Sequence, residues 1–205
     1  MLKIYLARHG QNEDNAQGIL NGHRDKPLTA LGLEQAKFLA RHIKNAGLVF
    51  NKVYSSPLSR ALETAREITK TLNLPDPEIL PLLIERDFGV MSGEKLSDIE
   101  KLCAPDIIKT DTLCYFLNPE GAETFPELLI RANKLLDQIK VRHQDGNILL
   151  VGHGDFGKMI YAAYYKLDWR EVLQLFHFGN TDLVLFLENT APNEAHVFET
   201  KQYNN

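Results

Sequence analysis

The stretch LARHGQNEDN, residues 6–15, indicates how the rest of the chain is built. Residues 2–7 form a short apolar run, and Arg8, His9 and Gly10 follow it at once. A short apolar run without strict alternation is typical of a parallel strand that is buried on both faces. In sheets of such strands, ligand-binding side chains stand at the carboxyl edge. We therefore expect a buried strand at residues 2–7, with Arg8 and His9 at an edge that binds a ligand.

Strands and helices are predicted to alternate along most of the chain. Apolar residues recur at helical spacing in residues 30–47, where Thr29 is suited to begin a helix and Gly47 to end it. Residues 48–56 are predicted to be a strand, and Pro57 opens a helix that ends before Pro75. Further along, we expect a helix at 124–143, a strand at 147–154, a helix at 157–167 and an antiparallel pair of edge strands at 181–188 and 195–200.

This alternation predicts an α/β fold. We expect a three-layer sandwich with a mostly parallel central sheet and helices on both faces. Between about residues 90 and 120, glycines and prolines interrupt the periodicity, which indicates a small cap or lid insertion. The length favours a single domain, residues 1–205, that carries this cap.

Composition narrows the class of protein without naming its activity. The hydrophobic fraction of 44% and the charged fraction of 24% are ordinary for a globular protein, and the net charge of −4 without a basic patch argues against nucleic-acid binding. The two cysteines do not make a disulfide scaffold, and no apolar run is long enough to span a bilayer. We predict a cytoplasmic protein that binds no membrane, and its sequence is compatible with a homodimer.

Three polar clusters follow predicted strands and are expected to converge. They are Arg8 with His9, residues 55–60 including Arg60, and His153. In a doubly wound sheet, such points can meet at one switch point. Two guanidinium groups and two imidazoles would form a cage for a tetrahedral dianion, so phosphate is the expected ligand.

The chemistry of such a cage favours attack by a histidine. Neighbouring guanidinium charge disfavours protonation of His9, which leaves a lone pair for attack on phosphorus. A backbone carbonyl that accepts from its other ring nitrogen would fix the tautomer. His153 would stabilise charge on the transferred phosphoryl group. Glu85, at the start of the irregular region, is our candidate general acid, because partial burial would raise its pKa; the alternative is a solvated loop carboxylate.

Five motifs, taken in order, resemble the histidine phosphatase superfamily, in the branch that contains phosphoglycerate mutases and small phosphomonoesterases. They are LARHGQNEDN (6–15), VYSSPLSRALETA (53–65), LIERDFGVMSG (83–93), NPEGAETF (118–125) and LLVGHGDF (149–156). Five ordered motifs at compatible spacing are far more specific than any one of them. The resemblance implies a phosphoglycerate mutase-like sandwich and a phosphohistidine intermediate.

The resemblance also implies roles for particular residues. His9 would be the phospho-accepting nucleophile and Glu85 the proton donor, and Arg8, Arg60 and His153 would bind the phosphoryl group. The further phosphate-binding or substrate-binding candidates are Asn15, Gly154, Asn12 and His23. Asn12 stands where the family commonly has Ser or Thr, so a hydroxyl contact is replaced by an amide or lost. His23 lies in a polar loop that could overhang the site, although solvent exposure is the simpler interpretation.

The family contains hydrolases and mutases, and the cap is expected to separate them. The cofactor-dependent mutases of the family carry a longer insertion with an arginine pair and a proline-rich run, and residues 93–121 contain neither. Their only cations are Lys95, Lys101 and Lys109. We therefore predict a histidine acid phosphatase-type phosphomonoesterase that hydrolyses a small phosphorylated metabolite. A phosphoglycerate mutase and a non-catalytic phosphoryl-binding protein are the two alternatives. Asp155 is expected to disfavour very anionic substrates.

No metal ion or organic cofactor is predicted. The remaining histidines are scattered without ligand spacing, and His177, between aromatic residues, is expected to be a core histidine. GHGDFG, residues 152–157, fits the dinucleotide-binding pattern GxGxxG after a strand. Too few residues follow it to complete a dinucleotide-binding fold, and the strands predicted there are antiparallel, so we reject this interpretation.

Overall fold

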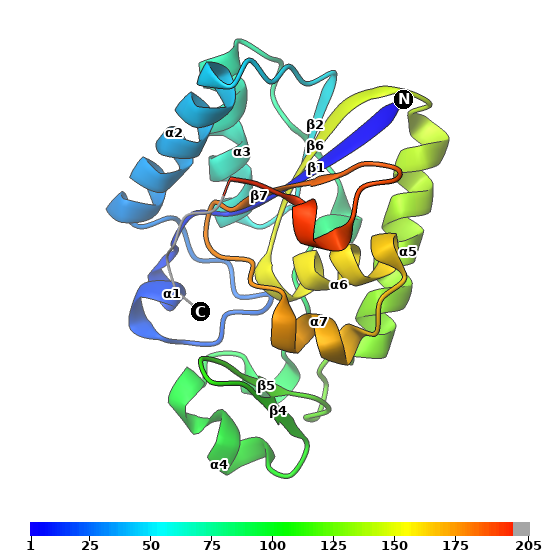
Figure 1. Ribbon diagram of the computed structural model, residues 1–205. Helices are drawn as coiled ribbons and strands as arrows, with labels where there is room; N and C mark the ends of the chain where they lie inside the picture. Colours follow the sequence, from blue (N-terminus) through cyan, green and yellow to red (C-terminus); the bar gives the residue numbers. More distant parts are fainter. Residues whose placement is uncertain (199–205) are drawn as a thin grey trace.

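The computed structural model describes residues 1–198, and a six-stranded sheet forms its centre. The order is β3-β2-β6-β1-β7-β8 (Figure 1). The strands are β1 (Leu2–Arg8), β2 (Lys52–Ser55), β3 (Glu78–Ile79), β6 (Gly146–Gly152), β7 (Leu183–Phe186) and β8 (His196–Phe198). The first four in this order are parallel, β7 is antiparallel to β1, and β8 is antiparallel to β7. The sheet is therefore mixed but mostly parallel.

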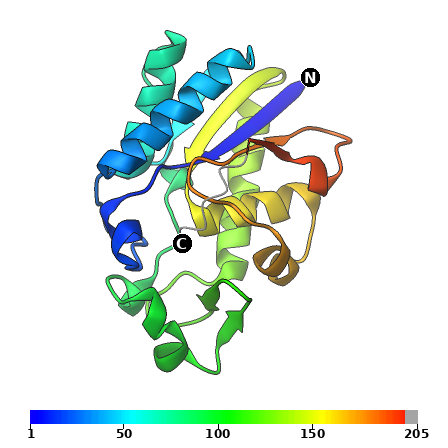
Figure 2. The ribbon, with the colours of Figure 1, turned by 60° about the vertical axis from the view of Figure 1, so that its left-hand side comes forward.

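Helices cover both faces of the sheet, which confirms the predicted three-layer α/β sandwich (Figures 1 and 2). On one face lie α2 (Ala30–Asn45) and α3 (Ser59–Leu72), and on the other α5 (Phe125–Arg142), α6 (Gly154–Tyr165) and α7 (Trp169–Leu175). The short α1 (Glu13–Gln17) lies in the loop after β1. Within residues 1–198, no helix combines the length and the apolarity needed to cross a membrane.

Both faces of strand β1 are buried, which explains why its sequence is apolar throughout. Ile4 and Leu6 belong to the core under α5 and α6, whereas Tyr5 and Ala7 belong to the core under α2 and α3. Successive side chains of a strand point to opposite faces, and here both faces are covered by helices. The strand predicted from this run is confirmed, and it extends to Arg8.

The predicted insertion forms a small unit past the carboxyl ends of the parallel strands (Figure 1, green). It contains α4 (Ile99–Cys103) and a two-stranded antiparallel sheet of β4 (Ile107–Lys109) and β5 (Cys114–Phe116). Three short 3-10 turns precede α4 along the chain, at Pro81–Leu83, Gly89–Met91 and Leu96–Asp98. A fourth, Pro192–Glu194, lies outside the cap and precedes β8. The cap is stabilised by its own apolar cluster, which is made of Leu20, Phe88, Met91, Ile99 and Phe116. This cap therefore packs partly on the loop that follows β1.

Several boundaries differ from the prediction. Strand β2 covers only the second half of residues 48–56, because Phe50 leaves the ladder and packs edge-on against Tyr5 at 5.1 Å between ring centroids. Strand β3 and helices α1 and α7 were not predicted. The antiparallel edge pair is confirmed as β7 and β8, and the last two residues predicted for the second strand, 199 and 200, lie outside the described residues.

The start of α6 is the boundary difference that matters most for the site. The prediction began this helix at residue 157, but it begins at Gly154, with extended backbone at His153 as its N-cap. The side chain of His153 makes no capping hydrogen bond. The free N–H groups of the first turn instead point towards Glu85, as described below, so a partner distant in sequence stabilises this helix end.

Candidate active site

The carboxyl ends of β1 and β6 and the first turn of α3 bring together the residues expected to converge. Arg60 Nε lies 3.2 Å from Nε2 of His9. The rings of His9 and His153 meet edge to face, with 5.1 Å between centroids. Arg8 ends β1 opposite Gly152, the residue before His153. Arg8, His9, Arg60 and His153, which we call the imidazole–guanidinium cluster, therefore lie at one edge of the sheet.

His9 is held in a single tautomer. Its side chain is buried, with 2% exposure, and Nδ1 donates a hydrogen bond to the carbonyl of Gly10 at 2.6 Å. Nε2 therefore carries the lone pair and accepts from Nε of Arg60. Burial, then the charges of Arg60 and Arg8, lowers the pKa of His9 well below its ordinary value. The ring is neutral near pH 7, as the sequence predicted.

Gly10 completes the geometry of the first motif. A Cβ atom at this position would lie 2.3 Å from the carbonyl oxygen of Gly32, at the start of α2. The backbone N–H of Gly10 donates to Oγ1 of Thr64 on α3. The close approach of the β1 loop to α2 therefore requires glycine after the Arg-His pair.

Arg60 is fully buried and held by three hydrogen bonds. Besides its bond to His9, Nη1 donates to the carbonyl of Arg24 at 2.8 Å and Nη2 to the carbonyl of Gly22 at 2.9 Å. Burial lowers its pKa to about 10, so it remains charged near neutral pH. The loop that follows α1 therefore fixes a permanent cation beside the lone pair of His9.

Two donors of the cluster lack a protein partner among residues 1–198. They are Nε of Arg8 and Nδ1 of His153, both buried. Nε2 of His153 lies 2.7 Å from Oγ of Ser56, which already accepts from the N–H of Leu58. If the Ser56 hydroxyl donates to Nε2, the ring proton of neutral His153 lies on Nδ1. Because buried donors are nearly always paired, these two N–H groups suit the oxygens of an anion.

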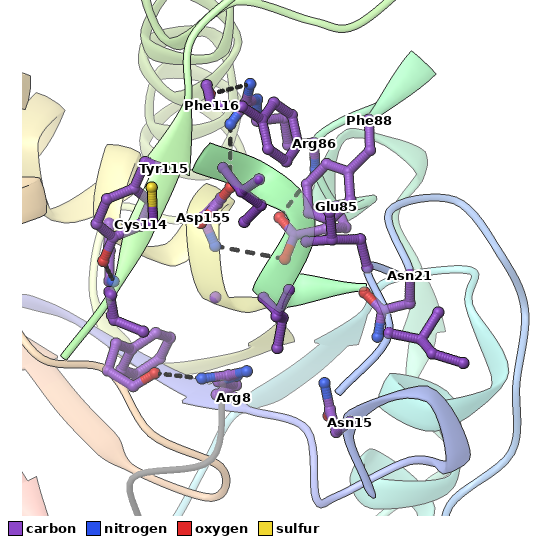
Figure 3. Close-up of a pocket in the computed structure, with 18 of the residues that line it drawn as sticks. Arg8, Asn15, Asn21, Glu85, Arg86, Phe88, Cys114, Tyr115, Phe116 and Asp155 are labelled. Carbon is purple, nitrogen blue, oxygen red and sulfur yellow. Dashed lines mark hydrogen bonds and ion pairs between the residues drawn. The ribbon is translucent and has the colours of Figure 1, made fainter. Parts of the chain in front are cut away.

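Glu85 lies at the N-terminus of α6. Its Oε1 accepts from the backbone N–H groups of Arg86 at 2.8 Å and Phe156 at 3.0 Å, and its Oε2 from that of Asp155 at 3.3 Å (Figure 3). The side chain is 5% exposed. Burial, and then the carboxylate of Asp155, raises the pKa of Glu85 above its ordinary value despite these bonds. The structure thus gives the carboxyl group the buried environment that the sequence predicted.

A cavity of about 90 Å³ separates the sheet edge from the cap (Figure 3). On the sheet side it is bordered by Arg8, Asn15, Glu85, Gly154, Asp155 and Lys158, and on the cap side mainly by Leu96, Ile99, Leu113, Tyr115 and Phe116. His9, Arg60 and His153 lie behind this lining and are buried. A phosphoryl group that reaches His9 must therefore replace the hydrogen bond between Arg60 and Nε2.

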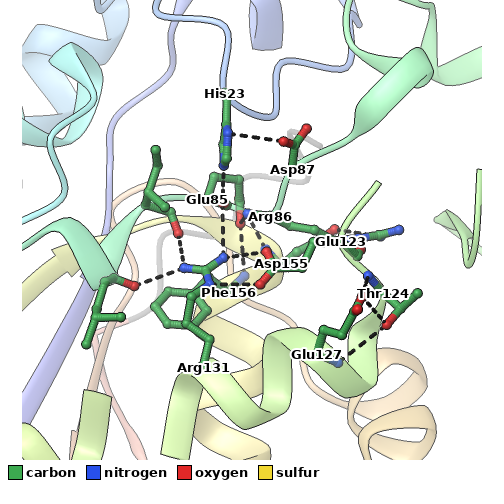
Figure 4. A network of polar contacts seen from close by, with 12 residues as sticks. His23, Glu85, Arg86, Asp87, Glu123, Thr124, Glu127, Arg131, Asp155 and Phe156 are labelled. Carbon is green, nitrogen blue, oxygen red and sulfur yellow. Dashed lines mark hydrogen bonds and ion pairs between the residues drawn. The ribbon is translucent and has the colours of Figure 1, made fainter. Parts of the chain in front are cut away.

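Two further sequence candidates, Asn12 and His23, also lie outside the lining of this cavity. Asn12 is the buried N-cap of α1, and its Oδ1 accepts from the N–H of Asn15 and from Nδ2 of Asn21. Its own Nδ2 is buried and has no partner in the described part of the chain. His23 is exposed, and its Nε2 donates to the carbonyl of Glu85 at 2.8 Å (Figure 4). His23 thus contacts the backbone of the candidate acid.

One prediction about a neighbouring residue needs correction. His177 was expected in the core, but it is half-buried and borders the cavity, because the segment before β7 passes along the cavity rim. Asp155, which was expected to disfavour very anionic substrates, borders the cavity as well. Its Oδ2 lies 3.3 Å from Nη1 of Arg86, a fully buried guanidinium that compensates its charge. Arg86 also donates to the carbonyls of Phe116 and Glu123, so it ties the cap to the site.

Lys158 borders the cavity and Arg131 holds the segment that carries Glu85, but the sequence analysis missed both. Arg131, on α5, donates to the carbonyls of Leu82 and Ile84 at 2.9 and 2.6 Å and to that of Glu85 at 3.2 Å (Figure 4). Nothing in its own helix distinguished it from a surface residue. Lys158 did leave a signal, since it is the one charged residue in the apolar run GKMIYAAYY of a helix expected to be buried. Asn180, whose Nδ2 donates to the carbonyl of His9, was also missed, and no sequence pattern indicated it.

The described residues offer no grouping of three His, Cys, Asp or Glu side chains that could hold a metal ion. The fold and the cluster define an α/β protein with buried imidazoles and guanidinium groups at the carboxyl ends of parallel strands. Residues 4–196 match the family model of the histidine phosphatase superfamily (branch 1), and the chain belongs to this family.

Relatives with different activities resemble the chain. It is 34% identical over 179 residues to a 2,3-bisphosphoglycerate-dependent phosphoglycerate mutase of Parvibaculum lavamentivorans, with 84% of each chain covered. It is 29% identical to phosphoserine phosphatase 1 of Hydrogenobacter thermophilus, with 82% of this chain and 78% of that one covered. The crystal structure of Entamoeba histolytica phosphoserine phosphatase in complex with 3-phosphoglyceric acid matches with a TM-score of 0.74, 26% identity and 99% of both chains.

Proposed function

We propose that the protein is a phosphomonoesterase that hydrolyses a small phosphorylated metabolite through a phosphohistidine on His9. The observation that carries the proposal is the state of the His9 ring. Nδ1 donates to a backbone carbonyl, Nε2 keeps its lone pair, and a buried guanidinium stands beside it. A neutral imidazole with a fixed lone pair is a nucleophile, whereas a histidine that only binds phosphate has no need of this tautomer.

In the proposed complex, the phosphoryl group lies between the cations of the cluster. The Nε of Arg8 and the Nδ1 of His153 supply donors that are already desolvated, and the Nε of Arg60 becomes a donor to the phosphoryl group when its bond to His9 is replaced. Such donors stabilise the charge of the transferred phosphoryl without reorganisation. Asn15 and Gly154 border the cavity at this end and are the next candidates for contact with phosphate oxygens. Asn12 would contribute through its free Nδ2.

The reaction then takes two steps. Nε2 of His9 attacks phosphorus, the bond to the ester oxygen breaks, and protonated Glu85 gives its proton to the departing alkoxide. The Glu85 carboxylate then takes a proton from water as the water attacks the phosphohistidine, which releases phosphate and restores both groups. The raised pKa of Glu85 suits the first step, because a buried carboxyl group keeps its proton to higher pH.

Hydrolysis is favoured over the mutase reaction by the side chains of the cap. A bisphosphorylated cofactor needs cations for its second phosphate. The cap residues that border the cavity are apolar or uncharged, and Lys95, Lys101 and Lys109 do not border it. A longer insertion does not distinguish the Parvibaculum mutase, contrary to the sequence argument, because the aligned segment is the same share of that chain and of this one.

Release of phosphate from p-nitrophenyl phosphate and from a panel of small phosphomonoesters tests the proposal. We expect turnover that falls by a factor on the order of 10³ or more in the His9→Ala variant. The His42→Ala variant, which changes a histidine of α2 away from the cavity, is the matched control. A native protein that binds these esters but releases no phosphate would instead be a phosphoryl-binding protein of the same fold.

The phosphoglycerate mutase reaction is the second candidate, and the 34% identity to the Parvibaculum mutase favours it. It is tested by incubating 3-phosphoglycerate with and without 2,3-bisphosphoglycerate and measuring 2-phosphoglycerate. Under our proposal, the bisphosphate does not stimulate isomerisation, and phosphate release exceeds isomerisation. Isomerisation faster than phosphate release, dependent on the bisphosphate, would make the protein a mutase.

A further inference from the structure

We propose that Lys158 and Tyr115 form a second subsite that binds a carboxylate of the substrate, so that the protein acts on small phosphomonoesters that carry a carboxylate. This inference rests on the proposed function, because it takes the phosphoryl group to lie at His9. None of the sequence motifs pointed to this pair of residues. Its basis is a buried ammonium group in the wall of the cavity.

Lys158 is a buried cation without an opposite charge in contact. It is 5% exposed, borders the cavity, and its Nζ contacts the hydroxyl of Tyr115. Within residues 1–198, no carboxylate oxygen lies within 4.0 Å of its Nζ. Burial of an ammonium group without an opposite charge costs free energy. We therefore infer that an anionic group of the ligand pairs with Lys158 in the cavity.

The other charged groups that border the cavity already have partners or separate roles. The carboxylate of Asp155 faces Arg86, and Glu85 accepts from three backbone N–H groups. Nη1 of Arg8 donates to the carbonyl of Phe178, and its free Nε belongs to the phosphoryl end. Lys158 is therefore the cation left for a second anionic group of the substrate.

The position of Lys158 along α6 fits a short substrate. It lies one helical turn after Gly154, and four residues advance a helix by about 6 Å. Gly154 borders Arg8, since a Cβ built on it would lie 3.3 Å from Cζ of Arg8. The backbone of Lys158 is thus displaced from the phosphoryl end by about 6 Å along the helix, and its side chain borders the same cavity. Figure 3 shows Tyr115 on the opposite side of the cavity from Asn15 and Asn21.

The charge of this end of the cavity favours a carboxylate over a second phosphate. One ammonium group and one phenol hydroxyl match the single charge and two oxygens of a carboxylate. A phosphate dianion would require further cations, and the neighbouring cap residues Leu113 and Phe116 supply none. The Entamoeba phosphatase, a relative that has been crystallised with phosphoserine and with 3-phosphoglyceric acid, shows that this family includes a binder of such compounds.

The test compares two substrates that differ in one group. 3-Phosphoglycerate and glycerol 3-phosphate have the same three-carbon chain, with a carboxylate in the first and a hydroxymethyl group in the second. We expect the ratio of their kcat/KM values to fall by about tenfold or more in the Lys158→Met variant, since the charged hydrogen bond is lost. Lys158→Arg should retain most of the preference. Lys134→Met, an exposed lysine of α5, is the control for loss of one positive charge.

Two outcomes overturn the inference. An equal loss on both substrates means that Lys158 serves the phosphoryl group or the fold, and an unchanged ratio means that it does not contact the carboxylate. The same comparison by calorimetric binding to His9→Ala, alone and combined with Lys158→Met, does not depend on turnover. Selective loss of 3-phosphoglycerate binding there supports the subsite even if the native protein releases no phosphate, in which case only the proposed hydrolysis fails.

Discussion

At the scale of single residues, Glu85 has two opposite proposed roles, as general acid and then as general base, and an experiment can separate them. We expect the Glu85→Gln variant to slow turnover by about 10²–10⁴-fold, because it can neither protonate an alkoxide nor activate water. p-Nitrophenolate leaves without a proton, so the first turnover of p-nitrophenyl phosphate should persist as a burst of about one nitrophenol per site. Rapid-mixing absorbance measurements check this.

The matched control for that prediction is Glu120→Gln, an exposed carboxylate near the cap. It should keep normal turnover. Loss of the burst together with turnover in Glu85→Gln would show that Glu85 is needed before the ester bond breaks, and that the proposed division of its roles is wrong.

Glu85 and His9 together predict how the rate of turnover depends on pH. Burial and Asp155 raise the pKa of Glu85, so it stays protonated to higher pH. Burial, Arg60 and Arg8 lower the pKa of His9 well below 6.5, so it stays unprotonated to lower pH. For glycerol 3-phosphate, kcat/KM should therefore fall as the pH rises through the raised pKa of Glu85, and should show no acid limb with a midpoint near 6.5 that reports His9.

Glu85→Gln provides the control for this profile. It should remove the alkaline limb, whereas a limb caused by ionisation of the substrate phosphate, whose second pKa is about 6, would remain. A protonation near pH 6.5 that inactivates the enzyme and maps to His9 would contradict the neutral nucleophile.

At the scale of secondary-structure elements, α5 holds the segment that carries Glu85. Arg131 donates to three carbonyls of residues 82–85 and pairs with Glu123 at 2.7 Å. We expect Arg131→Met to lower the free energy of unfolding by about 1–3 kcal/mol, because buried carbonyls lose their donor. It should also lower kcat more than it raises KM, because Glu85 loses its position. Urea unfolding and steady-state kinetics with glycerol 3-phosphate measure both.

Arg142→Met is the comparison variant on the same helix, where the arginine is exposed and pairs with Glu78. It should change stability by less than about 1 kcal/mol. Equal effects of the two variants on kcat would mean that Arg131 does not position Glu85.

The elements themselves were largely predictable from local signals. Thr29 caps α2 through Gly32, and Thr124 forms a capping box with Glu127 at the start of α5, so these helices start where their residues indicate. The start of α6 was not predictable, because its N–H groups are satisfied by Glu85, a residue 70 positions away from Asp155. Two-residue β3 is too short to leave a periodic signal.

At the scale of the whole molecule, folding leaves cations buried without anions, so phosphate should stabilise the fold. With inorganic phosphate at about ten times its Kd, the gain is about 1.4 kcal/mol, or a rise in Tm of about 3–6 °C. Thermal unfolding with phosphate, compared with chloride at equal ionic strength, measures it. Arg60→Met should abolish the rise and Arg66→Met, exposed on the same helix, should retain it. A rise that survives in Arg60→Met would place the bound anion elsewhere.

The candidate site was predictable only where imidazole or guanidinium side chains stand at the ends of predicted strands or at the start of a predicted helix. Arg8 ends a buried strand, His9 and His153 stand directly after such strands, and Arg60 lies in the first turn of a helix, so a parallel sheet brings them to one edge. Lys158, Arg131 and Asn180 reach the site through the packing of α5, α6 and the segment before β7. Such contacts depend on the order of elements in three dimensions, which no local pattern specifies.

The most direct test of the central claim is to locate the phosphoryl group on the protein during turnover. The enzyme is mixed with p-nitrophenyl phosphate, denatured at alkaline pH, where phosphohistidine persists, and its peptides are examined by mass spectrometry. The account predicts a phosphoryl group on His9, increased in amount in Glu85→Gln and absent in His9→Ala. A phosphoryl group on another residue, or phosphate release that continues at the native rate in His9→Ala, would contradict it.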